Sequence, residues 1–151
     1  MRWLVASVVA PCSLVWPQQS SVMGTWLTQS GGAQVRITPC QNPAQGPICG
    51  NIVGLINPKG PEGQVVAPDM ATDYRNTDPS LRGRKVLGIA LIWGFKATSD
   101  SNGFEDGQIY NGENGKIYNA NISQQPHGKL RLRGYVGPPM FGETQLWKRV
   151  N

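Results

Sequence analysis

The chain of 151 residues is poor in histidine, cysteine and charged residues, and it contains no long hydrophobic run. One histidine and the two cysteines that follow position 12 are fewer than the four ligands of a structural zinc site, so we expect neither a metal nor a cofactor. Charged residues make up 15% of the chain, against about 25% in typical globular proteins. This low share excludes a coiled coil, an acidic disordered chain and a histone-like protein.

Turn-forming residues are abundant by contrast, with 19 glycines and 12 prolines. A chain of this length predicts one domain with an ordinary hydrophobic core. The composition therefore favours a compact all-β domain with many turns.

The N-terminal residues have the pattern of a secretory signal sequence. Arg2 is followed by the uncharged, mostly apolar stretch from Trp3 to Trp16 and then by a polar stretch that ends at Ser21. The apolar stretch is shorter than the ~20 residues that span a bilayer, and it fits a signal-peptide core. We predict a signal peptide at 1–21 and a periplasmic or secreted domain at 22–151, without a membrane span. Two alternatives stay open, a lipid attached to Cys12 and a buried N-terminal strand.

The remaining cysteines agree with export. Cys40 and Cys49 are left once the signal sequence is removed. Two cysteines in an oxidising compartment predict one disulfide, and it closes a short loop that contains Pro43 and Pro47.

Short segments with β-strand character alternate with turn signals along the rest of the chain. The longest, Lys85 to Lys96, is predicted as a central strand bent at Gly88 or Gly94, and a short helical turn is expected after Asp78-Pro79. Eight predicted strands with hairpin-length links favour an antiparallel up-and-down barrel or a sandwich. The predicted strands are 24–29, 34–40, 48–56, 85–96, 108–111, 116–123, 129–137 and 142–150.

The sequence predicts a hairpin between residues 108–111 and 116–123 in residue-level detail. A three-residue loop, Glu113-Asn114-Gly115, fits a type I turn with a bulge and Gly115 at positive φ. This register places Tyr110 opposite Tyr118.

Residues 129–137 alternate apolar and polar side chains. Leu130 and Leu132 are expected to face the interior, because small barrels turn their apolar face inward. The opposite orientation, with Arg133 and Tyr135 inside, would give a polar cavity.

Both ends of the barrel sequence carry tryptophans. Gly24-Thr25-Trp26 opens the first strand and Trp147-Lys148-Arg149 ends the last. Lipocalin-type barrels place such a Gly-x-Trp at their closed end, with an arginine from the last strand across the indole. We therefore assign structural roles to Gly24, Trp26, Trp147 and Arg149.

The wider pattern resembles the bacterial domain of unknown function 2147 family over residues 22–150. This resemblance implies an exported protein with a lipocalin-like, calycin-type barrel, and it implies no activity. The chain departs from the family pattern at Phe104, where tryptophan is frequent, and at Asn111-Gly112. The matching stretches are Gly24–Trp26, Val35–Cys40, Cys49–Ile52, Asp73 with Asn76 and Asp78, Leu81–Arg84 with Leu87-Gly88, Gly107–Tyr110, Gly115–Tyr118, Leu132–Gly137, Phe141-Gly142, Gln145 and Trp147–Arg149.

No residue pattern points to catalysis, and we expect the protein not to be an enzyme. His127 lies in a Pro-His-Gly turn without an identifiable partner, and no nucleophile elbow or phosphate loop is present. Asp73, Asn76 and Asp78 are interpreted as turn and capping residues rather than cation ligands. The pair Glu105-Asp106 is interpreted as solvated.

The expected function is the binding of a small hydrophobic or amphipathic ligand inside the barrel. The candidate ligand-binding residues are Trp93, Tyr110, Tyr118, Arg133 and Tyr135. The alternative is a non-catalytic structural or interaction module of the cell envelope with a filled barrel. The net charge of +5 is scattered along the chain, so no nucleic-acid partner is expected, although the field attracts anions weakly.

Overall fold

The computed structural model describes residues 9–12 and 21–150, and these residues form nine strands and three 3₁₀ helices. The strands are β1 (Gly24–Leu27), β2 (Ala33–Thr38), β3 (Cys49–Leu55), β4 (Ala90–Trp93), β5 (Lys96–Ala97), β6 (Gly103–Asn111), β7 (Lys116–Gln125), β8 (Lys129–Tyr135) and β9 (Gly142–Arg149). The 3₁₀ helices are Pro43–Gln45, Pro68–Met70 and Pro79–Leu81.

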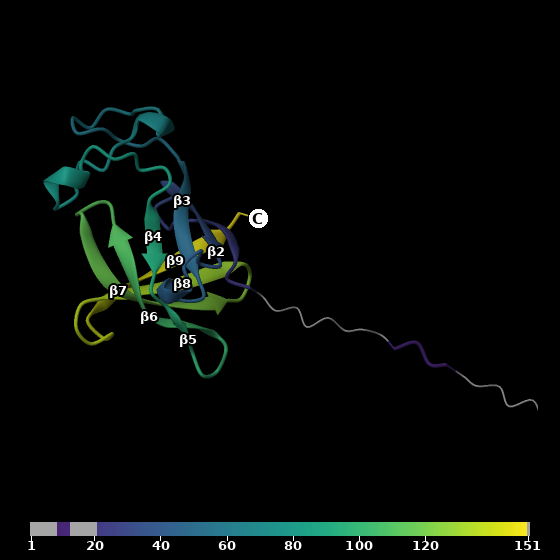
Figure 1. Ribbon diagram of the computed structural model, residues 1–151. Helices are drawn as coiled ribbons and strands as arrows, with labels where there is room; N and C mark the ends of the chain where they lie inside the picture. The colour runs from purple at the N-terminus through teal and green to yellow at the C-terminus, as the bar shows by residue number, and fades with distance from the viewer. Residues whose placement is uncertain (1–8, 13–20, 151) are drawn as a thin grey trace, which may run out of the picture.

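Eight strands close into an antiparallel barrel (Figure 1). Their order is β4-β3-β2-β1-β9-β8-β7-β6, and the pairing of β4 with β6 completes the ring. β5 pairs with the first part of β6. The predicted up-and-down barrel is confirmed, and the sandwich is excluded.

Alternating side chains account for this closure. Val35 and Ile37 on β2, and Leu130 and Leu132 on β8, are almost completely buried, whereas the arginines between them are exposed. These two strands therefore bury one apolar face in the interior. The predicted inward orientation of the two leucines is confirmed.

One end of the barrel is closed by an indole. Trp26 is fully buried, and its Nε1 donates a 2.8 Å hydrogen bond to the carbonyl of Val22. The guanidinium of Arg149 lies 4.3 Å from the centroid of the ring, and it donates to the carbonyls of Met23 and Ser21. This is the arrangement that the sequence predicts, and a cation over an indole contributes about 0.5–2 kcal/mol.

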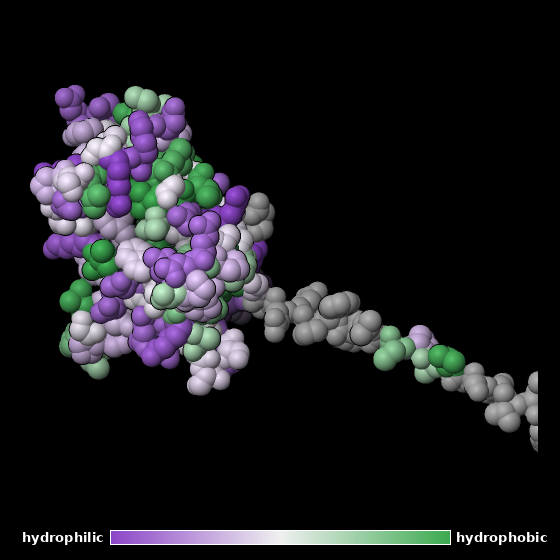
Figure 2. All heavy atoms as spheres, viewed as in Figure 1, coloured by the Kyte–Doolittle hydropathy of each residue, from purple (hydrophilic) through white to green (hydrophobic). Residues whose placement is uncertain are grey.

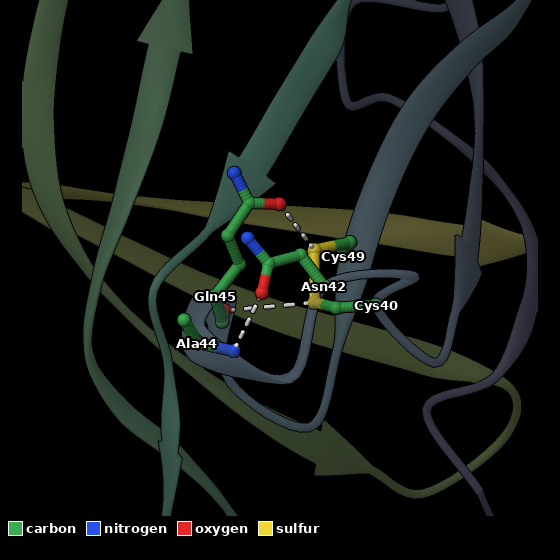
Figure 3. The surroundings of a disulfide bond; sticks show 5 residues. All are labelled: Cys40, Asn42, Ala44, Gln45 and Cys49. Atoms are coloured by element: carbon green, nitrogen blue, oxygen red, sulfur yellow. Dashed lines mark hydrogen bonds between the residues drawn. A yellow bond between two sulfur atoms is a disulfide. The ribbon is translucent and has the colours of Figure 1, made fainter.

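The predicted Cys40–Cys49 disulfide is confirmed (Figure 3). Its loop bends over the closed end, where Gly94 N donates to the carbonyl of Gln45. Gly46 has a φ of 91°, and a Cβ there would lie 2.2 Å from the carbonyl oxygen of Phe95. Only glycine fits this contact between the loop and the barrel.

Residues 85–96 do not form the single long strand predicted, although the chain does change direction at the two glycines that were predicted to bend it. The strand is confined to β4, and β5 follows a break at Gly94. Gly88 and Gly94 have φ values of 91° and 78°, which no regular strand accommodates. Residues 85–89 instead end the long connection from β3.

The predicted register of the β6–β7 hairpin is also wrong. Tyr118 pairs with Ile109, and Tyr110 pairs with Ile117. The loop contains four residues, 112–115, and a shift of one position reverses the face of every side chain. Gly115 has the predicted positive φ, 71°.

The predicted signal sequence lies outside the described residues except for 9–12 and Ser21. Cys12 is exposed and has a free thiol. In the part of the chain that the structure describes, no helix is long and apolar enough to cross a membrane.

Candidate functional site

A cavity of about 1000 Å³ occupies the barrel at the end opposite Trp26. Its wall draws on the β1–β2 turn, the β3–β4 connection, the β6–β7 turn and the β8–β9 loop, which together surround an open mouth. Figure 1 shows the β3–β4 connection above the upper end of the barrel, beside the β6–β7 turn. The volume lies within the range of pockets that hold small molecules.

The wall of the cavity is largely apolar. Among the lining side chains are Ile52 on β3, Leu91 on β4, Leu132 on β8 and Trp147 on β9, each at most 8% exposed. Burial of an apolar ligand against such a wall stabilises a complex by about 25 cal/mol per Å².

Small residues leave the space in the middle of the barrel. Gly134 pairs with Ala120 on β7 and with Glu143 on β9. A Cβ on Gly134 would meet its nearest neighbours, Ile109 and the Asn119 carbonyl, only at 4.0 Å. The strand pattern therefore leaves room where a larger side chain would fill the interior.

Polar groups are concentrated nearer the mouth. Gln145 lines the cavity, and its Oε1 accepts a 3.1 Å hydrogen bond from Nε1 of Trp147. Gln145 pairs with the buried Leu132 and is nevertheless exposed. Such exposure on the inward face means that solvent enters the barrel.

The predicted ligand-binding residues divide between the cavity and the outer surface. Tyr110, Tyr118 and Tyr135 contribute to the cavity wall. Tyr118 is half-buried, and its hydroxyl accepts a 2.7 Å hydrogen bond from Nδ2 of Asn114 in the β6–β7 turn. Tyr118 is therefore the predicted residue with a polar group placed at the mouth.

Trp93 and Arg133 lie away from the cavity. Trp93 follows the fully buried Ile92, and its Nε1 donates to Oε1 of Gln108 at 2.8 Å. Arg133 donates to the carbonyls of Pro139 and Met140, and so holds the β8–β9 loop. Successive side chains of a strand point to opposite faces, and the neighbours of both residues face the interior, so Trp93 and Arg133 point outward.

Tyr135 is held at the edge of the cavity. It is 7% exposed, and its hydroxyl lies 3.4 Å from Oδ1 of Asn121. Burial raises the pKa of Tyr135, and the negative charges of Asp106 and Glu105 raise it further.

A buried polar cluster fastens the β3–β4 connection to the mouth. Oδ1 of Asp73 accepts a 2.6 Å hydrogen bond from the hydroxyl of Tyr110. Oδ2 of Asp73 accepts hydrogen bonds from Nε of Arg84 and Nδ2 of Asn76, both at 2.9 Å. The guanidinium of Arg84 also lies 5.3 Å from the centroid of the Tyr110 ring.

This environment changes the acidity of Tyr110. Burial raises its pKa to about 12, and the hydrogen bond and the charge of Asp73 act in the same direction. Deprotonation would place two negative charges side by side, so the phenol remains a hydrogen-bond donor at neutral pH.

The polar residues at 73–78 have structural partners. Asp73 is saturated by Tyr110, Arg84 and Asn76, and Oδ1 of Asp78 accepts from Ser80 N at 2.9 Å. The capping role predicted for Asp78 is confirmed, whereas the Asp73 carboxylate bonds to side chains and joins the β3–β4 connection to β6. Sequence reasoning missed the bond between Asp73 and Tyr110, because 37 positions separate the two residues.

A closed eight-stranded antiparallel barrel, with an indole at one end and a cavity at the other, is a lipocalin-like fold. The solved structure of protein HP1028 from the human pathogen Helicobacter pylori, described as belonging to the lipocalin family, has a similar fold. It matches with a TM-score of 0.67 at 20% identity, and the alignment covers 87% of this chain and 84% of that chain.

The chain belongs to the family described as "Uncharacterized protein conserved in bacteria (DUF2147)", which it matches over residues 24–149. The resemblance drawn from its sequence motifs is therefore confirmed. A search of the curated proteins finds no match.

Proposed function

We propose that the protein is an exported, non-catalytic binding protein that holds a small hydrophobic or amphipathic molecule inside its barrel. The observation that carries this proposal is the cavity of about 1000 Å³, with an apolar wall and polar groups at its mouth. An amphipathic molecule would place its apolar part against Leu132 and Trp147 and its polar end near Gln145 and Tyr118.

The alternative, a structural module of the envelope, was based on a barrel filled by side chains. The open interior favours ligand binding over this alternative. Export is supported by the Cys40–Cys49 disulfide, because such bonds persist in oxidising compartments.

The direct test is to recover the protein from the periplasm of its native cells and to identify bound small molecules by mass spectrometry. We expect one class of hydrophobic or amphipathic compound in amounts comparable to the protein. Repeated recovery of protein without any bound compound would count against the proposal.

Filling the cavity provides a test that does not require the natural ligand. Gly134→Leu places a side chain in the open interior, and it should weaken the binding of the amphipathic dye anilinonaphthalene sulfonate at least tenfold. The measurement is a fluorescence titration at equal protein concentration.

The matched control is Gly83→Leu, because a Cβ at Gly83 meets no atom within 4 Å and the residue lies outside the cavity wall. This variant should bind the dye like the unmodified protein. Equal dye binding by both variants, each with its barrel intact by circular dichroism, would place the bound dye outside the barrel.

A further inference from the structure

The outer surface of β1, β2, β8 and β9 carries a concentration of positive charge. Side chains that alternate with buried neighbours point outward here, and the set comprises Arg36, Lys129, Arg131, Arg133 and Lys148. We refer to these five residues as the basic face. The single carboxylate within these four strands, Glu143, lines the cavity instead.

The register of the strands brings like charges together on this face. Lys129 and Lys148 are direct cross-strand partners, and Arg131 follows two positions along β8. Like charges opposite each other destabilise a sheet. The ion pairs found among the described residues, Arg84–Asp73 and Lys96–Asp106, lie elsewhere. An anion outside the molecule is therefore the natural partner for these cations.

An apolar loop tip adjoins the basic face. The β8–β9 loop exposes Val136, Met140 and Phe141 to 66%, 75% and 71%. Figure 1 shows this loop projecting at the side of the barrel, and hydrophobic atoms appear at the corresponding place in Figure 2. Leu146, which is 47% exposed, pairs with Arg131 and adds apolar surface within the basic face.

Arg133 joins the two surfaces. Its Nε donates to the Pro139 carbonyl at 3.0 Å, its Nη2 to the Met140 carbonyl at 3.2 Å, and its Nη1 to Oγ1 of Thr144 at 2.9 Å. These three bonds hold the exposed side chains of the tip in a fixed position beside the cations. An ordered apolar tip loses little conformational entropy when it is buried in a partner.

We propose that the basic face and the β8–β9 tip dock the protein onto an anionic lipid bilayer. The cations match the phosphate-bearing headgroups, and Met140 and Phe141 reach the acyl boundary. Phe141 and Val136 also line the mouth of the cavity, so docking brings the mouth to the lipid surface. A nucleic acid would satisfy the cations, but Val136 and Met140 offer neither an aromatic ring for base stacking nor a hydrogen-bond donor. This interaction goes beyond the proposed function and does not depend on it.

The test is co-sedimentation of the protein, as recovered from cells that express the full chain, with vesicles of phosphatidylcholine alone or mixed with phosphatidylglycerol. We expect binding only to the mixed vesicles, and at least tenfold weaker binding in 0.5 M than in 0.05 M NaCl. All variants share the same N-terminus, so residues 1–21 contribute equally to each.

Two sets of substitutions separate the contributions of charge and apolar surface. The triple variant Lys129→Ser, Arg131→Ser and Lys148→Ser should bind about 100-fold more weakly. The double variant Met140→Ser and Phe141→Ser should bind about tenfold more weakly while keeping its salt dependence. The double variant Lys129→Arg and Lys148→Arg should preserve binding.

The control for charge is the triple variant Lys85→Ser, Lys96→Ser and Lys116→Ser, which removes the same charge from exposed positions outside the basic face and the cavity wall. It should bind the mixed vesicles nearly as the unmodified protein does. Equal losses in both triple variants would show a general charge effect and overturn the proposal. Duplex DNA binding that is as tight as vesicle binding, and unaffected by the tip substitutions, would overturn it in favour of a polyanion site.

Discussion

At the residue scale, the carboxylate of Asp73 organises the mouth of the cavity. It is 4% exposed and accepts hydrogen bonds from Tyr110, Asn76 and Arg84. Those three partners lie in the β3–β4 connection and on β6, so one side chain connects the two elements. A buried carboxylate that lost these donors would be strongly destabilising.

The raised pKa of Tyr110 makes stability depend on pH in the alkaline range. In the unfolded chain this phenol titrates near 10.0, and in the folded protein near 12. The folded state therefore binds the phenol proton of Tyr110 more tightly than the unfolded state does. The stability that this proton contributes is complete below pH 10 and is lost as the pH rises towards 12. We expect the free energy of unfolding to fall by about 2 kcal/mol over this range, measured by urea denaturation.

The substitution Tyr110→Phe should remove most of this alkaline loss, and it should lower stability at neutral pH by about 1–3 kcal/mol because Asp73 loses a donor. Tyr118→Phe is the matched control, and it should retain the loss because Tyr110 is intact. An unchanged alkaline profile in Tyr110→Phe would contradict this assignment.

At the scale of elements, the disulfide loop between β2 and β3 supports the closed end. The Gln45 carbonyl accepts from Gly94 N at the break between β4 and β5. The loop therefore stabilises the place where the chain changes from one strand to the next.

Removal of this disulfide should destabilise the protein measurably. Loop-closure entropy gives about 2.5–3 kcal/mol for a loop this short. The double variant Cys40→Ser and Cys49→Ser should lose about that amount in urea denaturation. Reductant should lower the stability of the unmodified protein to the same level, and it should leave the variant unchanged.

The elements that the sequence predicts well are those set by local patterns. The alternation in β2 and β8, the cysteine pair and the capped turn at Asp78-Pro79 each follow from neighbouring residues. The face of each tyrosine at the β6–β7 hairpin depends on whether its loop has three or four residues. Neighbouring residues do not determine that length, and the loop packs on a distant segment: a Cβ on Gly115 would lie 2.2 Å from the Arg75 carbonyl oxygen.

The candidate site was predictable to a similar degree. Tyr118 follows from the barrel pattern, whereas Gln145 and the open space at Gly134 require knowledge of the register. Arg133 is a candidate only in the orientation that turns its face of the strand inward, and its partners are instead carbonyls of the β8–β9 loop, which has no periodic pattern. Sequence alone identified the lipocalin-like barrel, and the structure was needed to locate its cavity.

At the scale of the whole molecule, the proposed export makes a prediction about processing. A full-length gene expressed in a bacterium should give a periplasmic protein whose intact mass lacks the first 20 or 21 residues. Alkylation without reductant should leave that mass unchanged, because Cys40 and Cys49 are joined. Recovery of the unprocessed chain from the cytosol would refute export.

The pair formed by Trp26 and Arg149 at the closed end of the barrel also restricts where a peptidase can cut the chain. Trp26 and Arg149 use the carbonyls of Ser21, Val22 and Met23 as acceptors. Removal of Val22 would leave the buried Nε1–H of Trp26 without a hydrogen-bond acceptor. The guanidinium of Arg149 would also lose an acceptor, the carbonyl of Ser21. Under the proposed export, removal of the signal peptide after Ser20 would leave Ser21, Val22 and Met23 as the first residues of the mature chain, and their carbonyls are the acceptors that complete the closed end of the barrel.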